Sequence, residues 1–591
     1  MPIDSIPHRL FKRAATTPDA PAFHVKQGGA WVPSTWRDYA RDVRRVSKAL
    51  LALNFEPGQT VCILGFNRPE WAIFDLGAMA IGGAPAGIYT TCSAVEVAYI
   101  VQHAESPVLL LEDQGQWDKI VGKLGELPNL RRVVTMKGFA VDHPIAQTWD
   151  AFLASGDSID DAKVDQRLGA LKDEDLATLI YTSGTTGPPK GVMLSHRNLA
   201  WTADCALKLV PIGVGHCSVS YLPMSHIAEQ MFSLHIPVSG GAEIYFAEGV
   251  TKVLDNLKEV QPHVVFAVPR VWEKFYAGVT AKLKEATGIK GALVGWARGV
   301  AGEVHDVKNQ GLEPSGFLAF KYQIAQKVVL SKLRTALGLG RAFICVSGAA
   351  PVSKDILVFF ATLDVPIREV YGQSEGTGPT TFNTTSRTRF GSVGPAIPGC
   401  EVKIAPDGEI CLRGPNVFMG YFKDKAATDD CLLDGWLHSG DLGAFDDANF
   451  LTITGRKKDI LITAGGKNIA PKNIEAALKQ IPLVGDAVVI GDRRKFLTAL
   501  LTLDVDQLAK AAQTAGTTPD AIRDAPATRA ALQAGIDAIN KDLAQVETIK
   551  RFTLLPAPFS VETGELTPSL KMKRNVVTKK FEAQIDAMYA E

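Results

Sequence analysis

The stretch Tyr181–His196 combines residue types that suit an anionic phosphate. It runs YTSGTTGPPKGVMLSH, in which Thr182–Gly187 are all glycine, serine or threonine, and Lys190 follows a stiff proline pair. Glycines let backbone amides turn towards a ligand, hydroxyl groups add hydrogen-bond donors, and a lysine adds positive charge. Because the apolar, strand-like run Leu176–Ile180 comes directly before it, we predict a phosphate-binding loop and not a flexible surface connection.

The loop does not match a Walker phosphate loop. That motif needs a glycine, four residues of any type, and then Gly-Lys-Ser/Thr. Counted from Gly184, Pro189 stands where the second glycine is required and Gly191 stands where Ser or Thr is required. We therefore predict a phosphate loop of another kind.

The composition bounds the class of protein. A chain of 591 residues is too long for one hydrophobic core, so we expect at least two domains. Lys+Arg and Asp+Glu balance at 63 each, which gives no overall field for binding nucleic acid. The eight cysteines form no C-x-x-C pair and no zinc-type cluster with histidine, as expected for the reduced thiols of a cytoplasmic protein.

Targeting segments are not evident in the sequence. The first residues lack the apolar core of a signal peptide, and no run reaches the roughly 18 apolar residues of a membrane span. Peripheral contact with a membrane stays open, as does the oligomeric state.

Helical and strand-like patterns alternate along the chain. Trp36–Leu53 carries apolar residues at helical spacing, while Val61–Asn67 and Pro107–Asp113 are apolar runs typical of buried parallel strands. The alternation resumes after the phosphate loop, where we expect strands within Ala242–Gly249, His263–Arg270, Arg341–Pro351 and Val365–Gly378. This rhythm predicts an α/β fold with doubly wound sheets.

The later part of the chain changes character twice. From Phe390 it is β-rich, with a hairpin predicted over Val402–Gly414, and beyond Arg456 a smaller α/β pattern begins. We predict a large domain over residues 1–457 and a small C-terminal domain over 458–591. Residues 271–340 read as a helical insertion with more basic than acidic residues. Its outer face is either simply solvated or a surface that meets acyl chains, anionic lipid or a coenzyme.

Five separated motifs agree in order and spacing. They are YLPMSHIAEQ (Tyr221–Gln230), YGQSEGTGP (Tyr371–Pro379), GWLHSGDLG (Gly435–Gly443), ITAGGKNIAPKNIE (Ile462–Glu475) and GELTPSLKMKR (Gly564–Arg574). With these motifs the chain, from about Trp36 to Lys580, resembles AMP-forming acyl-CoA synthetases of the adenylate-forming superfamily, and within it the long-chain synthetases of the bubblegum type. The resemblance implies doubly wound sheets plus a small β-barrel-like part in the large domain, and a mobile small domain.

The resemblance also implies a reaction in two halves. A long-chain fatty acid attacks the α-phosphate of ATP to give acyl-AMP and pyrophosphate, and the thiol of coenzyme A then displaces AMP to give acyl-CoA. The first half passes through a highly anionic centre, which needs cations and hydrogen-bond donors around it. The implied ligands are therefore a fatty acid, ATP, Mg²⁺ and coenzyme A, with no nucleic acid.

Carried over residue by residue, the resemblance places the nucleotide on three segments. The β- and γ-phosphates fall to Thr182, Ser183, Gly184, Thr185, Thr186 and Gly187, with Lys190 in the same signature. Tyr371 would lie against the adenine, Gly372 would belong to the same nucleotide site, and Ser374, where the family more often has threonine, would donate to the α-phosphate. Glu375 would hold Mg²⁺ through a carboxylate oxygen.

The ribose and the acyl group fall to other positions. Asp441 would accept both ribose hydroxyls, and Arg456 would also reach the ribose. Gly348 and Ala349 would form the adenine floor and one wall of the acyl tunnel. His226 would stand near the substrate carboxylate, with a packed core histidine as the plainer interpretation.

The small domain would supply the adenylation lysine. Lys571 matches the lysine that approaches the carboxylate and the α-phosphate, although Leu570 replaces the usual preceding glycine and Lys573 is an alternative. Lys458 matches the hinge about which the small domain swings, and Gly465 matches the face that passes coenzyme A.

Two other functions are weighed against the CoA ligase. One is a fatty acyl-AMP ligase that passes its acyl group to a carrier protein, and the other is a non-catalytic nucleotide- or lipid-binding relative. Residues 271–340 favour a long acyl chain, since short-chain and aryl relatives usually lack such an insertion. The chain length itself cannot be predicted from scattered tunnel residues.

Overall fold

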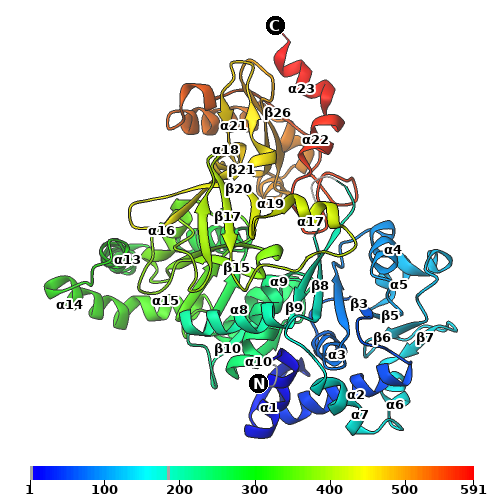
Figure 1. The fold of residues 1–591 in the computed structure, drawn as a ribbon. Coiled ribbons are helices and arrows are strands. Elements are labelled where there is room, and N and C mark those ends of the chain that lie inside the picture. Colours follow the sequence, from blue (N-terminus) through cyan, green and yellow to red (C-terminus); the bar gives the residue numbers. More distant parts are fainter. Residues whose placement is uncertain (1–3, 183–186, 591) are drawn as a thin grey trace.

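The computed structural model describes residues 4–182 and 187–590. Figure 1 shows the early part of the chain, in blue and cyan, beside a central green region, with the C-terminal segment in orange and red at the top. The loop residues Ser183–Thr186 lie outside the described residues, so the assignments made to them are not placed.

An eight-stranded, mostly parallel sheet organises the first part of the chain, in the order β18-β9-β8-β4-β3-β5-β6-β7. In that order its strands are Gly420–Tyr421, Lys190–Ser195, Leu176–Thr182, Ala84–Ile88, Thr60–Leu64, Val108–Leu111, Arg132–Thr135 and Ala146–Thr148. The strands expected at Leu176–Ile180, Val61–Asn67 and Pro107–Asp113 are β8, β3 and β5, and the expected loop joins the antiparallel pair β8–β9.

Both faces of this sheet carry helices. Val61 and Ile63 of β3 face the cluster that contains helices α2 (Trp36–Ala52) and α3 (Pro69–Met79). Cys62 and Leu64 point the other way, towards helices α4 (Ala94–His103) and α5 (Gln114–Val121). Alternate side chains of a strand lie on opposite faces, so a run that is apolar throughout is buried on both sides. The doubly wound α/β prediction is confirmed.

Two four-stranded sheets follow, in the orders β10-β11-β1-β2 and β12-β13-β14-β15. The first contains Cys217–Ser220, Glu243–Phe246, Pro21–Gln27 and Ala30–Thr35, and the second contains Val264–Ala267, Ile344–Ser347, Ile367–Gln373 and Gly378–Phe382. All four strands expected between residues 242 and 378 are present. The parallel pairing of β12, β13 and β14 ends at Ala267, Ser347 and Glu369, and β14 continues to Gln373 in its pairing with β15.

Residues 269–336 are helical, as expected for the insertion. They form α12 (Pro269–Lys284), α13 (Gly288–Asn309), α14 (Gly316–Ala325), the π-helical turn η4 (Gln326–Leu330) and α15 (Ser331–Ala336). Helices α13 and α14 pack on a small apolar cluster of their own, which includes Ala297, Ala301 and Ala325. In Figure 1 these two helices stand at the left edge of the molecule.

The β-rich part forms an antiparallel sheet of five strands. They are β16 (Glu401–Ile404), β17 (Glu409–Arg413), β19 (Leu432–Leu433), β20 (Trp436–Phe445) and β21 (Leu451–Arg456). The hairpin expected over Val402–Gly414 is the pair β16–β17. This sheet brings β20 and β21 next to the turn after β14.

The C-terminal segment has its own hydrophobic core. It follows the short 3₁₀ helix η6 (Lys457–Asp459) and holds α18 (Pro471–Leu478), α19 (Val505–Ala515), α21 (Pro526–Asn540), α22 (Arg574–Lys580) and the sheet of β24 (Val484–Ile490), β25 (Leu497–Leu503) and β26 (Ile549–Leu554). Its two apolar clusters contain only residues from Leu461 onwards. We propose that the domain boundary lies between residues 457 and 458, because no member of these clusters comes from the chain before it.

Among the helices of the described residues, none combines the length and the apolar character needed to cross a membrane.

Candidate active site

One cavity of about 2280 Å³ is lined by residues of the eight-stranded sheet, the β12–β15 sheet, the antiparallel sheet and the C-terminal segment. Most of the side chains selected from the sequence line it: Thr182, Lys190, His226, Ala349, Tyr371, Gly372, Ser374, Glu375, Asp441, Arg456, Lys458 and Lys571. They come from segments almost 400 residues apart, so the fold has gathered a site that the linear motifs only imply.

The loop predicted to bind phosphate joins β8 to β9. Thr182 and Lys190 are partners in the register of that pair, so the loop between them leaves and re-enters the sheet at one point. Gly187 has φ +87°, a left-handed conformation that favours glycine. The Lys190 ammonium lies 3.4 Å from an Asp424 carboxylate oxygen and 4.9 Å above the Tyr421 ring. The lysine is thus held at the cavity wall by Tyr421 of β18 and by Asp424, which follows that strand.

The turn after β14 presents Glu375 to the cavity. Its carboxylate accepts a hydrogen bond of 2.7 Å from the hydroxyl of Tyr421, on β18. Gly372 is required by the fold, because a Cβ there would stand 1.7 Å from the carbonyl oxygen of Gly378 on the returning strand. Ser374 is buried at the start of the turn. Tyr421 is a site residue that the sequence motifs did not reveal.

Three side chains form a connected set at the other side of this turn. The Tyr371 hydroxyl donates to Asp441 Oδ2 at 2.9 Å, and Arg456 Nε donates to Asp441 Oδ1 at 2.7 Å. Asp441 and Arg456 are also register partners in the pair β20–β21. The Asp441 side chain is nearly buried, and a hydrogen bond at each of its two oxygens fixes the orientation of the carboxylate.

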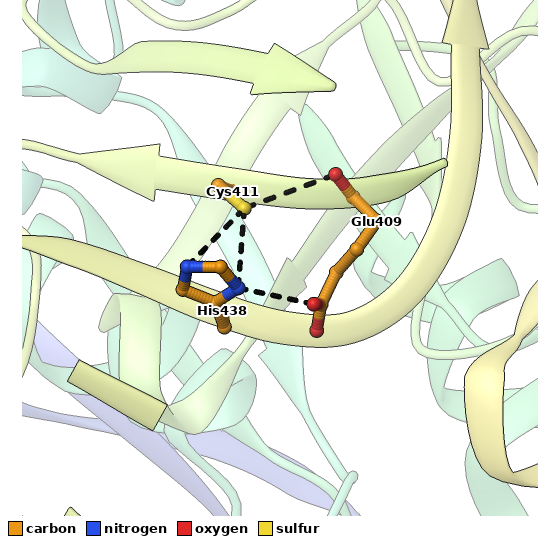
Figure 2. Close-up of side chains that lie close together, drawn as sticks. All are labelled: Glu409, Cys411 and His438. Atoms are coloured by element: carbon orange, nitrogen blue, oxygen red, sulfur yellow. Dashed lines mark hydrogen bonds and ion pairs between the residues drawn. The ribbon is translucent and has the colours of Figure 1, made fainter. Parts of the chain in front are cut away.

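A cluster of Glu409, Cys411 and His438 lies on β17 and β20, the second of which also carries Asp441 (Figure 2). His438 Nδ1 lies 3.0 Å from Glu409 Oε2 and 3.5 Å from Cys411 Sγ, and the Gly440 amide donates to Glu409 Oε1 at 2.8 Å. The Lys457 ammonium lies 3.1 Å from Glu409 Oε2, so it already supplies positive charge at that oxygen.

The ionisation of this cluster fits a bracing role. Burial alone would raise the pKa of the Glu409 carboxyl. Hydrogen bonds from His438 and the Gly440 amide outweigh burial, so the pKa is lowered. Burial raises the pKa of the Cys411 thiol, which opposes the thiolate that a metal ion prefers. A metal ion would also have to displace Lys457. We conclude that Glu409 braces β20 at His438 and Gly440, just before Asp441.

Gly348 and Ala349 follow β13 and differ in their surroundings. A Cβ on Gly348 would lie 2.7 Å from Val370 Cγ1, so the glycine lets β13 and β14 approach. Ala349 has φ +69° and lines the cavity, where its small side chain leaves room. The first residue thus serves the packing of the strands and the second faces the site.

His226 caps the helix α9 (Ile227–Gln230), and its Nδ1 accepts from the Ala228 amide at 3.1 Å. Burial and the nearby Lys571 ammonium lower the pKa of His226 to about 4. The imidazole is therefore neutral near pH 7, and it lines the cavity with one nitrogen already occupied by the helix.

Lys571 projects into the cavity from a tight turn. The Lys571 amide donates to Thr567 Oγ1 at 3.0 Å, and the Thr567 amide donates back to the Lys571 carbonyl at 2.8 Å. Leu570 between them has φ +60°, which explains why glycine suits this position. Burial and the neighbouring Arg456 guanidinium lower the pKa of the Lys571 ammonium. Lys573 does not line the cavity and instead caps α22.

Two contacts tie the C-terminal segment to the large part in this arrangement. The Thr91 hydroxyl donates to the Pro568 carbonyl at 2.6 Å, and Arg270 pairs with Asp504 at 2.7 Å. Lys458 in η6 also lines the cavity. Gly465 is exposed and apart from the cavity, and a Cβ there would meet only Thr463 Oγ1, at 3.9 Å. Its assignment to a coenzyme face stays a prediction.

An apolar arm of the same cavity runs along helix α8 (His196–Leu209). Thr202, Cys205, Ala206 and Leu209 recur at helical spacing on one side of α8 and line the arm. Opposite them stand apolar residues of α9, the π-helical turn η2 (Met231–His235) and α10 (Ile236–Gly240), namely Ile227, Met231, Phe232 and Ile236. The helical spacing in α8 was a visible signal, but it does not distinguish a ligand wall from core packing.

The chain matches two family descriptions, AMP-binding enzyme over residues 10–422 and AMP-binding enzyme C-terminal domain over residues 458–591. It is 39% identical to the long-chain-fatty-acid–CoA ligase ACSBG2 of Xenopus laevis, over 99% of this chain and 84% of that protein. It is 35% identical to the long-chain-fatty-acid–CoA ligase FadD15 of Mycobacterium tuberculosis, over 99% of this chain and 97% of that protein.

Solved structures share the fold at lower identity. The anthranilate CoA ligase AuaEII in complex with anthranoyl-AMP superposes with a TM-score of 0.72 at 18% identity, covering 99% of this chain and 98% of that one. ATP-bound MatB from Rhodopseudomonas palustris gives a TM-score of 0.70 at 21% identity, with 98% of each chain covered. Because the family match spans both parts of the chain, the protein belongs to the AMP-binding enzyme family.

Proposed function

We propose that this protein is an AMP-forming long-chain fatty acid–CoA ligase. The observation that carries the proposal is the continuity of one cavity. Its polar end holds Glu375, Asp441 and Lys571, and its apolar arm lies between α8 and η2. A carboxylate activated at the polar end would have room for an apolar tail in the same space. The identity to long-chain ligases over almost the whole chain supports this substrate class.

The polar end fits ATP. Asp441 offers a two-oxygen acceptor to the vicinal hydroxyls of the ribose, beside Arg456 and Tyr371. Thr182 and Lys190 line the cavity at this end, which supports the proposal that they and Gly187 hold the β- and γ-phosphates. The assignments to Ser183–Thr186 extend that proposal. Ser374 and Gly372 supply the turn that faces the adenine and the α-phosphate.

Mg²⁺ fits the donor chemistry of this end. Glu375 offers a hard carboxylate oxygen towards the cavity, and the Tyr421 hydrogen bond fixes its orientation. When bound, the ion would neutralise phosphate charge. The protein's own contribution is to present that carboxylate at one place.

Lys571 would stabilise the adenylation step directly. A carboxylate oxygen of the fatty acid forms a bond to the α-phosphorus of ATP, and the bond to pyrophosphate breaks. Negative charge builds on the α-phosphate oxygens, where a protonated lysine is most useful. His226, neutral near pH 7, would serve by hydrogen bonding near the carboxylate and not by its charge.

The second half needs another face of the C-terminal segment. The sulfur of coenzyme A forms a bond to the acyl carbon, AMP leaves with the bonding pair, and the thiol proton passes to solvent. We propose that rotation about Lys458 withdraws Lys571 and brings Gly465 to the cavity. The Thr91–Pro568 and Arg270–Asp504 contacts would break in that motion.

We propose a cytoplasmic location. All eight cysteines lie in the described part of the chain and all are free thiols, as in a reducing compartment.

Product analysis tests the proposal. The protein is mixed with palmitate, ATP, Mg²⁺ and coenzyme A, and the products are separated by mass. Palmitoyl-CoA and AMP are expected in equal amounts. Accumulated palmitoyl-AMP without palmitoyl-CoA would point to an acyl-AMP ligase that serves a carrier protein. Absence of pyrophosphate release across acids from acetate to very long chains would point to a non-catalytic relative.

A further inference from the structure

The outer face of the α13–α14 hairpin exposes an unusual set of large apolar side chains. Ile289 is 90% exposed, Phe317 73% and Phe320 58%, and the others are Leu293, Trp296, Leu312, Ile324 and Val328. Scattered single apolar residues are normal on a protein surface, but a group on two adjacent helices marks an interaction site. We call these eight residues the hairpin face.

Helical spacing places these side chains together. Ile289, Leu293 and Trp296 recur at intervals of four and three along α13, and Phe317, Phe320 and Ile324 at intervals of three and four along α14. Neighbouring positions of the same helices, among them Ala297, Ala301 and Ala325, pack on each other and on the turn η4. The apolar surface of the hairpin therefore extends beyond these inner contacts, and the hairpin face stays exposed. In Figure 1 it projects from the edge of the molecule.

Positive charge surrounds the hairpin face. Lys282, Lys284, Lys290, Lys327 and Lys332 are all exposed on or next to the hairpin. The Lys321 ammonium lies 5.4 Å above the Phe317 ring. Basic residues outnumber acidic ones between residues 282 and 332. Exposed aromatic and aliphatic groups with flanking lysines are the features of helices that lie in the interface of an anionic bilayer.

We propose that the hairpin face docks on the surface of a bilayer that contains anionic lipid. The lysines would meet the headgroups, while Trp296, Phe317 and Phe320 enter the acyl boundary. A symmetric contact with a second copy of this chain would instead place lysines against lysines. The charge pattern therefore favours a lipid surface over self-association.

The docking face is joined to the cavity by one helix. Pro269, Arg270 and Lys274 in the first turns of α12 line the cavity, and the same helix ends at Lys284, four residues before the hairpin. At 1.5 Å per residue, α12 spans about 24 Å. Docking of the hairpin face would therefore hold the cavity about one length of α12 from the membrane. The proposal itself does not depend on the enzymatic activity.

Vesicle flotation of the full chain tests it. The protein is mixed with neutral vesicles of phosphatidylcholine alone, or with vesicles that also contain about 30% phosphatidylglycerol. The second kind has a negative surface potential that attracts lysine side chains. We expect binding to the anionic vesicles, weaker binding at 0.5 M salt, and little binding to the neutral ones. F317S/F320S should lower binding about ten-fold or more, and K290E/K327E should remove the preference for anionic lipid.

Matched controls isolate the hairpin face. Val214 and Val505 are 65% and 59% exposed on other parts of the surface, so V214S and V505S should bind as the unaltered chain does. W296F replaces the indole of the hairpin face with a phenyl ring of similar hydrophobicity. Quenching of tryptophan fluorescence by brominated lipid should therefore fall in this variant.

Several results would overturn the proposal. They are no flotation of the folded chain with either vesicle, equal flotation of F317S/F320S, and unchanged bromolipid quenching in W296F. A dimer on light scattering that F317S/F320S converts to a monomer would also overturn it, because the face would then be an interface between copies.

Discussion

The Tyr421 hydroxyl donates a 2.7 Å hydrogen bond to the Glu375 carboxylate, from a strand 46 residues further along the chain. The same tyrosine ring lies under the Lys190 ammonium. One aromatic side chain therefore links the end of the phosphate loop to the carboxylate proposed for Mg²⁺. Outer partners of a metal ligand commonly change affinity or activity by about 10- to 100-fold when removed.

Tyr421→Phe should raise the Mg²⁺ concentration needed for half-maximal pyrophosphate release by about ten-fold, because the carboxylate loses its orienting donor. Glu375→Gln removes the carboxylate itself, so pyrophosphate release should respond to added Mg²⁺ even less than in Tyr421→Phe. The Mg²⁺ titration of pyrophosphate release measures both. Y245F, at a tyrosine on the distant strand β11, serves as the control, and an unchanged titration in both site variants would refute the assignment.

Leu570 offers a test of backbone strain at the adenylation turn. Its φ of +60° costs a non-glycine residue about 1 kcal/mol, and its side chain is 67% exposed. Leu570→Gly should therefore raise the free energy of unfolding of the C-terminal segment by up to about 1 kcal/mol, offset in part by the greater freedom of glycine in the unfolded chain. Urea unfolding followed by circular dichroism measures it. Leu570→Ala keeps the strain and should show no gain; equal stability of the two variants would contradict the explanation.

The apolar arm should set the length of the acyl chain. Ala206 stands in the middle of the α8 wall, so Ala206→Phe fills the arm. We expect kcat/KM for palmitate to fall by at least about ten-fold, while kcat/KM for a short acid such as hexanoate changes little, since excluding a chain from its pocket forfeits several methylene contacts. An acyl-chain series measured by AMP formation reports the shift. Equal losses for both acids would mean that the arm holds no acyl chain.

The pH dependence should reveal the charge of Lys571. Burial and Arg456 lower its pKa below the ordinary value of 10.5, so the active ammonium is present at lower pH and is lost as pH rises through the lowered pKa. The profile of kcat/KM for ATP, which reports the free enzyme, should therefore fall on its alkaline side with a midpoint below 10.5.

Two variants check the assignment of that limb. Lys571→Arg keeps its charge at all accessible pH and should lose the alkaline limb. His226 has its pKa lowered to about 4 and should contribute no ionisation near neutral pH. An acid limb near pH 6.5 that disappears in His226→Asn would contradict the neutral histidine.

Much of the fold follows from local pattern. Runs that are apolar throughout, such as Val61–Leu64, are buried on both faces of the sheet. Such runs therefore predicted the doubly wound sheet correctly. The site motifs at Tyr371–Glu375 and at Asp441 were also visible, because short turns with special residues carry their chemistry in the sequence.

Long-range contacts were not visible. Tyr421 reaches Glu375 because β18 pairs with β9, more than 220 residues earlier, and no local pattern encodes that pairing. The α8 stripe looks like ordinary core until the cavity is seen. From the sequence, Leu570 was visible only as a departure from the glycine that the family usually has. The structure adds that this position has a positive φ, which glycine adopts more easily than leucine.

The most direct test of the account compares Lys571→Ala with Lys573→Ala in the two half-reactions. Pyrophosphate release from ATP and palmitate measures adenylation, and palmitoyl-CoA formation from supplied palmitoyl-AMP measures thiolysis. Lys571→Ala should slow adenylation by about 10²–10³-fold and leave thiolysis nearly unchanged, as expected for the loss of one transition-state charge partner. Lys573 does not line the cavity, so Lys573→Ala should change neither adenylation nor thiolysis. Equal damage to both halves by Lys571→Ala, or a larger adenylation defect in Lys573→Ala, would contradict the account.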